Sequence, residues 1–122
     1  MRQKKEELPV VLEAPGVKMR SLGGQGGMAI THVEISEPAD FRPVLEGLPN
    51  DKCQVPHWGY VIKGKVTLEY EDGVVESYES GQVYYQPPGH TGQAEAGTET
   101  IEFSPDEEFA GLLEHFRSKM GG

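Results

Sequence analysis

The fold is decided by residues 65–90, which read KVTLEYEDGVVESYESGQVYYQPPGH. Polar and apolar side chains alternate at the start of this stretch, so that Val66, Leu68 and Tyr70 share one face, as in a strand with one buried side. The Asp-Gly pair at 72–73 follows, and such a pair is typical of the tight turn between two antiparallel strands. The first part of the stretch, residues 65–78, therefore predicts a β-hairpin.

Shorter alternating segments on both sides of this hairpin predict further strands at residues 28–36, 82–86 and 99–103. The chain also contains 16 Gly and 9 Pro, residues that favour tight turns and interrupt long strands. A chain of 122 residues is expected to build one hydrophobic core. The sequence thus indicates a single all-β domain.

The two ends of the chain differ from this strand pattern. In residues 104–122, Ser104 is expected to cap a helix, with Pro105 at its first position and Glu107 completing a capping box. The following apolar residues recur at helical spacing: Phe109, Leu112, Leu113, Phe116 and Met120. We predict a C-terminal amphipathic helix over 104–122 that covers one face or end of the sheets. Residues 1–27, which finish in the sequence GGQGG, are predicted to form an N-terminal arm and a Gly-rich join.

Composition argues against two classes of partner. The formal net charge is −9, which repels both the phosphate backbone of nucleic acids and anionic lipid surfaces. No apolar run approaches the ~20 residues that span a bilayer, and the N-terminus lacks the apolar stretch of a secretory signal. The single cysteine has no partner for an internal disulfide. We therefore expect a cytoplasmic protein that binds neither nucleic acid nor membrane.

Two segments resemble the paired conserved motifs of the cupin superfamily: GYVIKGKVTLEY at 59–70 and SYESGQVYYQPPGHTGQAEAG at 77–97. Gly64 stands at the closing glycine of the first motif. The glycine, proline and glycine of the second fall on Gly81, Pro87 and Gly89. The resemblance implies a small antiparallel β-barrel of the jelly-roll type over residues 28–103. Because cupins of this size commonly pair, we also expect a homodimer that uses the arm or a sheet edge.

The resemblance implies metal-ligand positions that this chain has altered. His57 stands where cupins carry a glutamate ligand, while the two histidine positions fall on Asp51 and Cys53. In the second motif the histidine position falls on Gly92, and His90 stands two residues before it. For Cys53 and His57 to share an ion the chain between them must bend, and Pro56 is a reason to expect that bend.

Two ligand sets remain open for a divalent transition metal. Cys53 with His57 and His90 suits zinc or another thiophilic metal, whereas Asp51 with the same two histidines suits an open iron site. Nickel and manganese are further alternatives. Each residue also has a purely structural interpretation, with Cys53 as a small buried side chain and His90 as a hydrogen-bonding partner of its turn.

The same resemblance leaves two classes of function. Aromatic and histidine side chains are predicted to line the pocket: His32, Trp58, Tyr60 and Tyr85. With a bound metal, the pocket suits an enzyme of the dioxygenase or isomerase type acting on a small molecule. Without a metal, it suits a small-molecule binding or sensing module.

Overall fold

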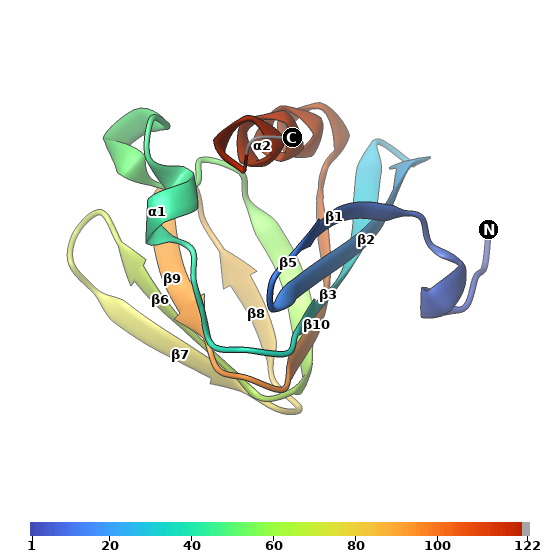
Figure 1. Cartoon of the computed structure of the whole chain (residues 1–122), viewed down its shortest axis with the longest axis horizontal. Helices are drawn as coiled ribbons and strands as arrows, with labels where there is room; N and C mark the ends of the chain where they lie inside the picture. Colours follow the sequence, from blue (N-terminus) through green and yellow to red (C-terminus); the bar gives the residue numbers. More distant parts are fainter. Residues whose placement is uncertain (121–122) are drawn as a thin grey trace.

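The computed structural model describes residues 1–120 and has two antiparallel sheets that enclose a common core (Figure 1). The six-stranded sheet has the order β1 (Val10–Ala14), β2 (Val17–Gln25), β3 (Met28–Ile35), β10 (Thr98–Pro105), β5 (His57–Lys63) and β8 (Val83–Gln86). The four-stranded sheet has the order β4 (Ala39–Asp40), β9 (His90–Ala94), β6 (Lys65–Tyr70) and β7 (Val75–Glu79). This arrangement confirms the all-β jelly-roll prediction.

The hairpin predicted from residues 65–78 is present as β6 and β7. Val66 lies opposite Tyr78 and Leu68 lies opposite Glu76. Gly73 adopts a φ of 84° in the turn between the strands, a conformation that glycine reaches without a steric penalty. Local turn chemistry therefore decides the register of this hairpin.

Helices close one end of the space between the sheets. Two short turns, Lys5–Glu7 and Pro49–Asp51, and the short helix α1 (Arg42–Leu45) lie in the loops. The long helix α2 (Asp106–Lys119) lies across the open end of the two sheets in Figure 1. Its buried side chains are Phe109, Leu112, Leu113 and Phe116, each contributing about 1.5–3 kcal/mol of hydrophobic stabilisation. The predicted helix thus covers an end of the barrel.

Among residues 1–120, none of the helices has the length and apolar character needed to span a bilayer.

The N-terminal residues differ from the prediction. Residues 10–25 were expected to form an arm outside the barrel, but they form β1 and β2 of the six-stranded sheet. Leu12 and Met19 are buried in the shared core, and this burial is what holds the segment on the sheet. The glycines at 26 and 27 belong to the turn between β2 and β3.

The start of the C-terminal helix also differs from the prediction. Helix α2 begins at Asp106, and Pro105 precedes it without a side-chain cap. Ser104 still belongs to β10, where it is fully buried. The expected capping box does not form because the chain remains extended through Pro105. Ser104 instead has a role in the interior of the barrel.

Candidate metal centre

Three of the predicted ligand residues meet inside the barrel: Cys53, His57 and His90. Cys53 forms an isolated bridge to His90, in which its backbone N–H donates to the carbonyl of His90 at 2.8 Å. The chain bends at Val55 before His57 opens β5, as the presence of Pro56 predicted. All three side chains are buried, and one donor atom of each lies within 4.8 Å of the others.

The spacing of the sulfur and the imidazole matches tetrahedral metal coordination. The distance between Cys53 Sγ and His57 Nε2 is 3.6 Å. Bonds of about 2.3 Å to sulfur and 2.0–2.1 Å to nitrogen, at a tetrahedral angle, place the two ligand atoms about 3.6 Å apart. The rings of His57 and His90 lie 5.2 Å apart between centroids, edge to face. The donor set therefore fits a small thiophilic ion such as zinc.

Hydrogen bonds fix which nitrogen each histidine presents. His90 Nδ1–H donates to the carbonyl of Pro87 at 2.7 Å. His57 Nδ1 lies 2.6 Å from Ser104 Oγ and 3.1 Å from Glu102 Oε2. Metal-binding histidines commonly donate their second ring nitrogen to such oxygens, which fixes the tautomer and the ring orientation. In both residues Nε2 is thus the nitrogen left for an ion.

Burial holds both imidazoles in the neutral form that binds metals. Loss of solvent lowers the pKa of His57 from 6.5 to about 4. Burial, with the neighbouring His57, also lowers the pKa of His90 to about 4. Burial raises the pKa of the Cys53 thiol to about 12, so without a metal this thiol is protonated and points to the Val55 carbonyl at 3.7 Å. An ion that binds here must displace that proton, which makes its affinity rise with pH.

Glu102 is a site residue that the sequence analysis did not identify. It lies on β10, its carboxylate faces the cavity, and burial raises the pKa of this carboxyl group to about 7. Tyr84 donates a hydrogen bond from its hydroxyl to Glu102 Oε1 at 3.3 Å. The available signal was the alternation in residues 98–104, where polar side chains occupy every second position: Thr98, Thr100, Glu102 and Ser104.

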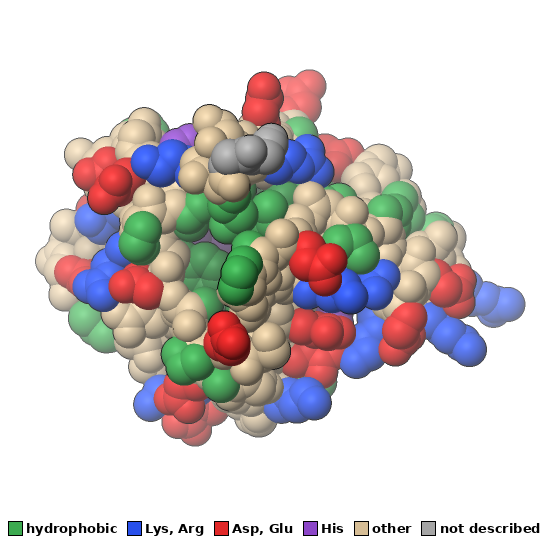
Figure 2. Space-filling model, viewed as in Figure 1, with side chains coloured by type: hydrophobic (Ala, Val, Ile, Leu, Met, Phe, Trp, Pro, Cys, Tyr) green, Lys and Arg blue, Asp and Glu red, His purple; other side chains and the backbone are tan. Residues whose placement is uncertain are grey.

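The cluster forms the polar part of a cavity of about 110 Å³. Glu102, Tyr84 and Gln86 extend this polar part along the cavity wall. The rest of the lining is mostly apolar and includes three side chains of α2: Phe109, Leu112 and Phe116. Figure 2 shows hydrophobic side chains gathered around a hollow on the face below α2. The cavity thus combines a group of metal-binding atoms with an apolar wall.

Three of the predicted pocket residues do not line this cavity. Trp58, Tyr60 and Tyr85 are between 41 and 48% exposed and lie on the outer face of the six-stranded sheet. The reason is strand alternation, because His57 points inward from β5 and its neighbour Trp58 must then point outward. The aromatic side chains proposed as a pocket wall are therefore surface residues.

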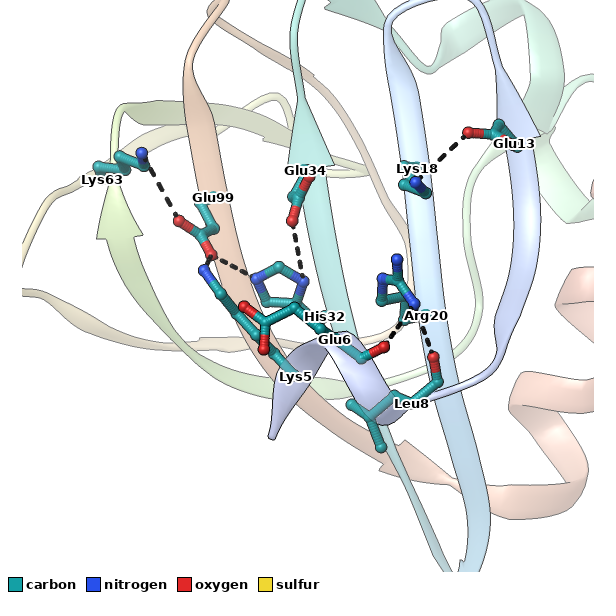
Figure 3. Close-up of polar contacts among 10 residues, drawn as sticks. All are labelled: Lys5, Glu6, Leu8, Glu13, Lys18, Arg20, His32, Glu34, Lys63 and Glu99. Carbon is teal, nitrogen blue, oxygen red and sulfur yellow. Dashed lines mark hydrogen bonds and ion pairs between the residues drawn. The ribbon is translucent and has the colours of Figure 1, made fainter. Parts of the chain in front are cut away.

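His32 is buried, but on the wrong face of the sheet for the pocket. Thr31 and Val33 line the cavity, so His32 points outward from β3. There its Nε2 lies 2.5 Å from Glu99 Oε2, which also accepts a hydrogen bond from Lys5 at 2.6 Å (Figure 3). Glu34 lies on the other side of the ring, 3.7 Å from Nδ1. His32 thus links the N-terminal turn to the sheet and does not line the pocket.

Asp51 does not join the metal-binding cluster. It lies at the end of the Pro49–Asp51 turn with an exposed side chain, and its carboxylate accepts a hydrogen bond from the Gly47 N–H at 3.0 Å. The predicted set of Asp51 with two histidines is not assembled, because this turn holds the carboxylate outside the barrel.

We expect the metal-free protein to lose stability in mild acid. Unfolded His57 and His90 take up protons near pH 6.5, whereas the folded protein resists until about pH 4, so the free energy of unfolding falls as pH falls through this window. Glu102 has the opposite effect on the free energy of unfolding. Its carboxyl group keeps its proton up to about pH 7 in the folded protein but only up to about pH 4.5 in the unfolded chain, so this group stabilises the fold as the pH falls.

The effect of the two histidines exceeds that of the one carboxyl group, so the free energy of unfolding should fall by about 3 kcal/mol between pH 7 and pH 4. Urea unfolding at several pH values would measure this loss, and the dependence on pH should be clearly weaker in His57→Gln. A free energy of unfolding that stays constant from pH 7 to pH 4.5 in the unmodified chain would contradict the expected burial of these groups.

Comparison with known proteins supports the fold. No protein-family model matches the sequence, and no curated protein gives a significant match. Among solved structures, an RmlC-like cupin from Shewanella frigidimarina is 18% identical, covers 88% of this chain and 93% of its own, and has a TM-score of 0.61. The polyketide cyclase RemF from Streptomyces resistomycificus is 18% identical, with coverage of 86% and 78% and a TM-score of 0.60.

A mutant of the oxalate decarboxylase OxdC from Bacillus subtilis is 22% identical, with a TM-score of 0.59. The match covers 84% of this chain but only 28% of that longer chain. Likenesses at this level of identity concern the fold. These structural matches agree with the two facing sheets and with the glycine turns at the motif positions. This chain therefore has the cupin fold.

Proposed function

We propose that this protein is a small cupin that holds a divalent transition metal through Cys53, His57 and His90 and binds a small molecule beside it. The observation that carries the proposal is the convergence of three buried donors with a sulfur-to-nitrogen distance of 3.6 Å. A thiolate with two imidazoles favours zinc, with iron and nickel as alternatives, whereas manganese prefers oxygen ligands and suits this donor set less well.

The cavity limits the kind of molecule that could bind. Its volume of about 110 Å³ is close to that of cavities of ~150 Å³ that accept benzene. The polar atoms lie near the proposed metal position, and apolar side chains of α2 line another part of the wall. We infer a ligand with a compact apolar body and one oxygen or nitrogen group that faces the histidines.

Glu102 supports an enzyme over a storage or sensing role. A metal with an open position would supply a Lewis acid that polarises an oxygen atom of the ligand. The Glu102 carboxyl has a pKa of about 7, so it can donate or accept a proton near neutral pH. Glu102 Oε2 lies 3.1 Å from His57 Nδ1, which orients the carboxyl group. These features favour a proton-transfer reaction of the isomerase type over an oxygen-dependent reaction.

The second candidate is a metal-free binding module. It is favoured by the state of Cys53, whose protonated thiol already has an acceptor in the Val55 carbonyl. In this case His57 and His90 would bind the polar group of the ligand directly through Nε2. The two candidates differ in a single measurable quantity, the metal content of the folded protein.

Metal analysis of matched variants tests the proposal. After expression with added zinc, the purified protein should contain about one metal ion per chain, and Cys53→Ser should lose most of it because the thiolate is the donor that makes the site thiophilic. Asp51→Asn should keep its metal, since Asp51 is exposed and bonded to Gly47. Elemental analysis of all three proteins gives the result. A folded chain without stoichiometric metal would favour the binding module, and metal loss only in Asp51→Asn would support the carboxylate set.

A further inference from the structure

A buried ring nitrogen on the outer side of the six-stranded sheet has no hydrogen-bond partner. His32 on β3 is 1% exposed, and its Nε2–H donates to Glu99 Oε2 at 2.5 Å. In the neutral ring the other nitrogen, Nδ1, then carries a lone pair. Among residues 1–120, no group forms a hydrogen bond with this Nδ1. Because buried polar atoms are almost always paired, an unpaired nitrogen of this kind indicates a ligand position.

The carboxylate of Glu34 lies on the Nδ1 side of the His32 ring. Its Oε1 is 3.7 Å from Nδ1, and its side chain is half exposed (Figure 3). A lone pair and a carboxylate that face each other at this distance repel each other unless a cation lies between them. Two ligand atoms that each bind an ion at about 2.1 Å, with about 110–120° between the bonds, lie about 3.4–3.6 Å apart. The distance between Nδ1 and Oε1 thus fits two ligands of one metal ion.

The basic side chains nearest to Glu34 are engaged with other groups. Lys18 lies opposite Glu34 in the pairing of β2 with β3, but its ammonium group is 3.7 Å from Glu13 (Figure 3). Arg20 lies opposite His32, and its guanidinium donates to two backbone carbonyls of the N-terminal segment at 3.0 Å. Among residues 1–120, Glu34 forms no ion pair with a lysine or an arginine. Its negative charge is therefore available to a metal ion.

Glu99 has a different role in this cluster. Its charge is compensated by Lys5 at 2.6 Å and by Lys63 at 3.8 Å. It accepts the hydrogen bond from His32 Nε2, and carboxylates commonly orient metal-binding histidines in this way. Glu99 also lies opposite Glu34 in the pairing of β10 with β3. One donor atom from each of His32, Glu34 and Glu99 lies within 4.8 Å of the others. These three side chains thus form a second group of metal-binding atoms, outside the barrel.

We propose that His32 Nδ1 and Glu34 bind a divalent metal ion, with Glu99 as the carboxylate that orients the ring and with water completing the coordination. An imidazole with carboxylate oxygens and water suits harder ions than a thiolate does, such as Mn²⁺ or Fe²⁺. The site therefore differs in selectivity from the cluster inside the barrel and is independent of it. Because Glu34 is half exposed, the ion exchanges readily with solvent and does not add to the metal content of the purified protein.

Manganese binding to matched glutamate variants tests the proposal. The electron paramagnetic resonance of free Mn²⁺ reports binding to the full chain at about 100 µM protein, where a site with a dissociation constant of that order is substantially filled. Glu34→Gln removes a ligand from a half-exposed position and should weaken binding at least about tenfold. Glu79→Gln is the matched control, because Glu79 is also an exposed strand glutamate but lies on β7 in the other sheet. It should bind Mn²⁺ as the parent does.

Paramagnetic broadening of NMR signals shows where the ion binds. Small amounts of Mn²⁺ should broaden the amide signals of His32, Glu34 and Glu99 in the parent protein and leave those of β7 sharp. His32→Gln should remove this broadening while its circular dichroism stays native. His57→Ala should retain it, because His57 faces the barrel interior.

Four results would overturn the proposal. The first is a parent chain that binds no Mn²⁺, and the second is binding that His32→Gln and Glu34→Gln both leave unchanged. Equal loss of binding in Glu34→Gln and Glu79→Gln would trace the effect to overall charge, and loss in His57→Ala would trace it to the barrel. Displacement of Mn²⁺ by an equal concentration of Mg²⁺ would also argue against a histidine ligand, because Mg²⁺ prefers oxygen ligands; we expect no such displacement.

Discussion

Substitution of His57 by alanine is expected to abolish metal binding. His57 provides the nitrogen 3.6 Å from the Cys53 sulfur, and its other nitrogen is held by Ser104 and Glu102. Loss of an outer hydrogen-bonding partner usually weakens a metal site by 10–100-fold, so loss of the ligand itself should cost more than about 100-fold. Metal content by elemental analysis and by native mass spectrometry should fall to background in His57→Ala.

Two further variants make this experiment specific. Ser104→Ala removes one of the two partners of Nδ1 and leaves Glu102 in place, so it should weaken metal binding about 10-fold without abolishing it. His32→Gln changes another buried histidine, one that faces away from the cavity, and should leave metal content unchanged. Full metal occupancy in His57→Ala would show that this site does not exist. Cys53 and His57 would then be packing residues of a metal-free pocket.

Substitution of Gly64 by alanine is expected to give the largest loss of stability. Gly64 joins β5 to β6 with a φ of 87°, which costs an alanine about 1–2 kcal/mol. A Cβ there would also lie 2.5 Å from Thr98 Cα and closer still to Thr98 Oγ1. Thr98 cannot easily retreat, because its hydroxyl is bonded to both the N–H and the carbonyl of Lys65. We expect a total loss of about 4 kcal/mol or more, which is a large part of the 5–15 kcal/mol by which a domain is typically stable.

Gly81 provides the matched control for this substitution. Its φ is 86°, almost the same as that of Gly64, but no atom of another part of the chain lies within 4 Å of the position that a Cβ would take. Gly81→Ala should therefore cost only the conformational part, about 1–2 kcal/mol. Urea unfolding of both variants separates the conformational cost from the steric one. Equal losses at the two positions would mean that the close approach of Thr98 to Gly64 has no energetic consequence.

Features that depend on neighbours along the chain could be predicted from the sequence. Alternation and the Asp-Gly pair identified the hairpin of β6 and β7, and the spacing of Phe109, Leu112 and Phe116 identified α2. The positions of Cys53, His57 and His90 also indicated a site, and Pro56 explained how the chain could bend to assemble it. Each of these predictions depends on a short stretch of sequence, because a few consecutive residues determine the side-chain periodicity of a strand or helix and the geometry of a turn.

The face of each strand that points inward could not be predicted from the sequence, because it depends on tertiary contacts. Strand alternation shows that Trp58 and His57 point to opposite faces of the sheet, but it does not show which of the two points inward. The preference of large apolar residues for the interior would have placed Trp58 inside. On β10 the polar residues Glu102 and Ser104 point inward, where they contact His57, and Phe103 between them points to the outer face of the sheet. From the sequence alone, the all-β fold, the final helix and four candidate ligands could be predicted, and three of these ligands meet in the barrel. The structure shows that Asp51 and the aromatic residues lie outside the barrel and that Glu102 and Ser104 complete the site. Contacts between residues far apart in the chain determine which face of a strand is buried.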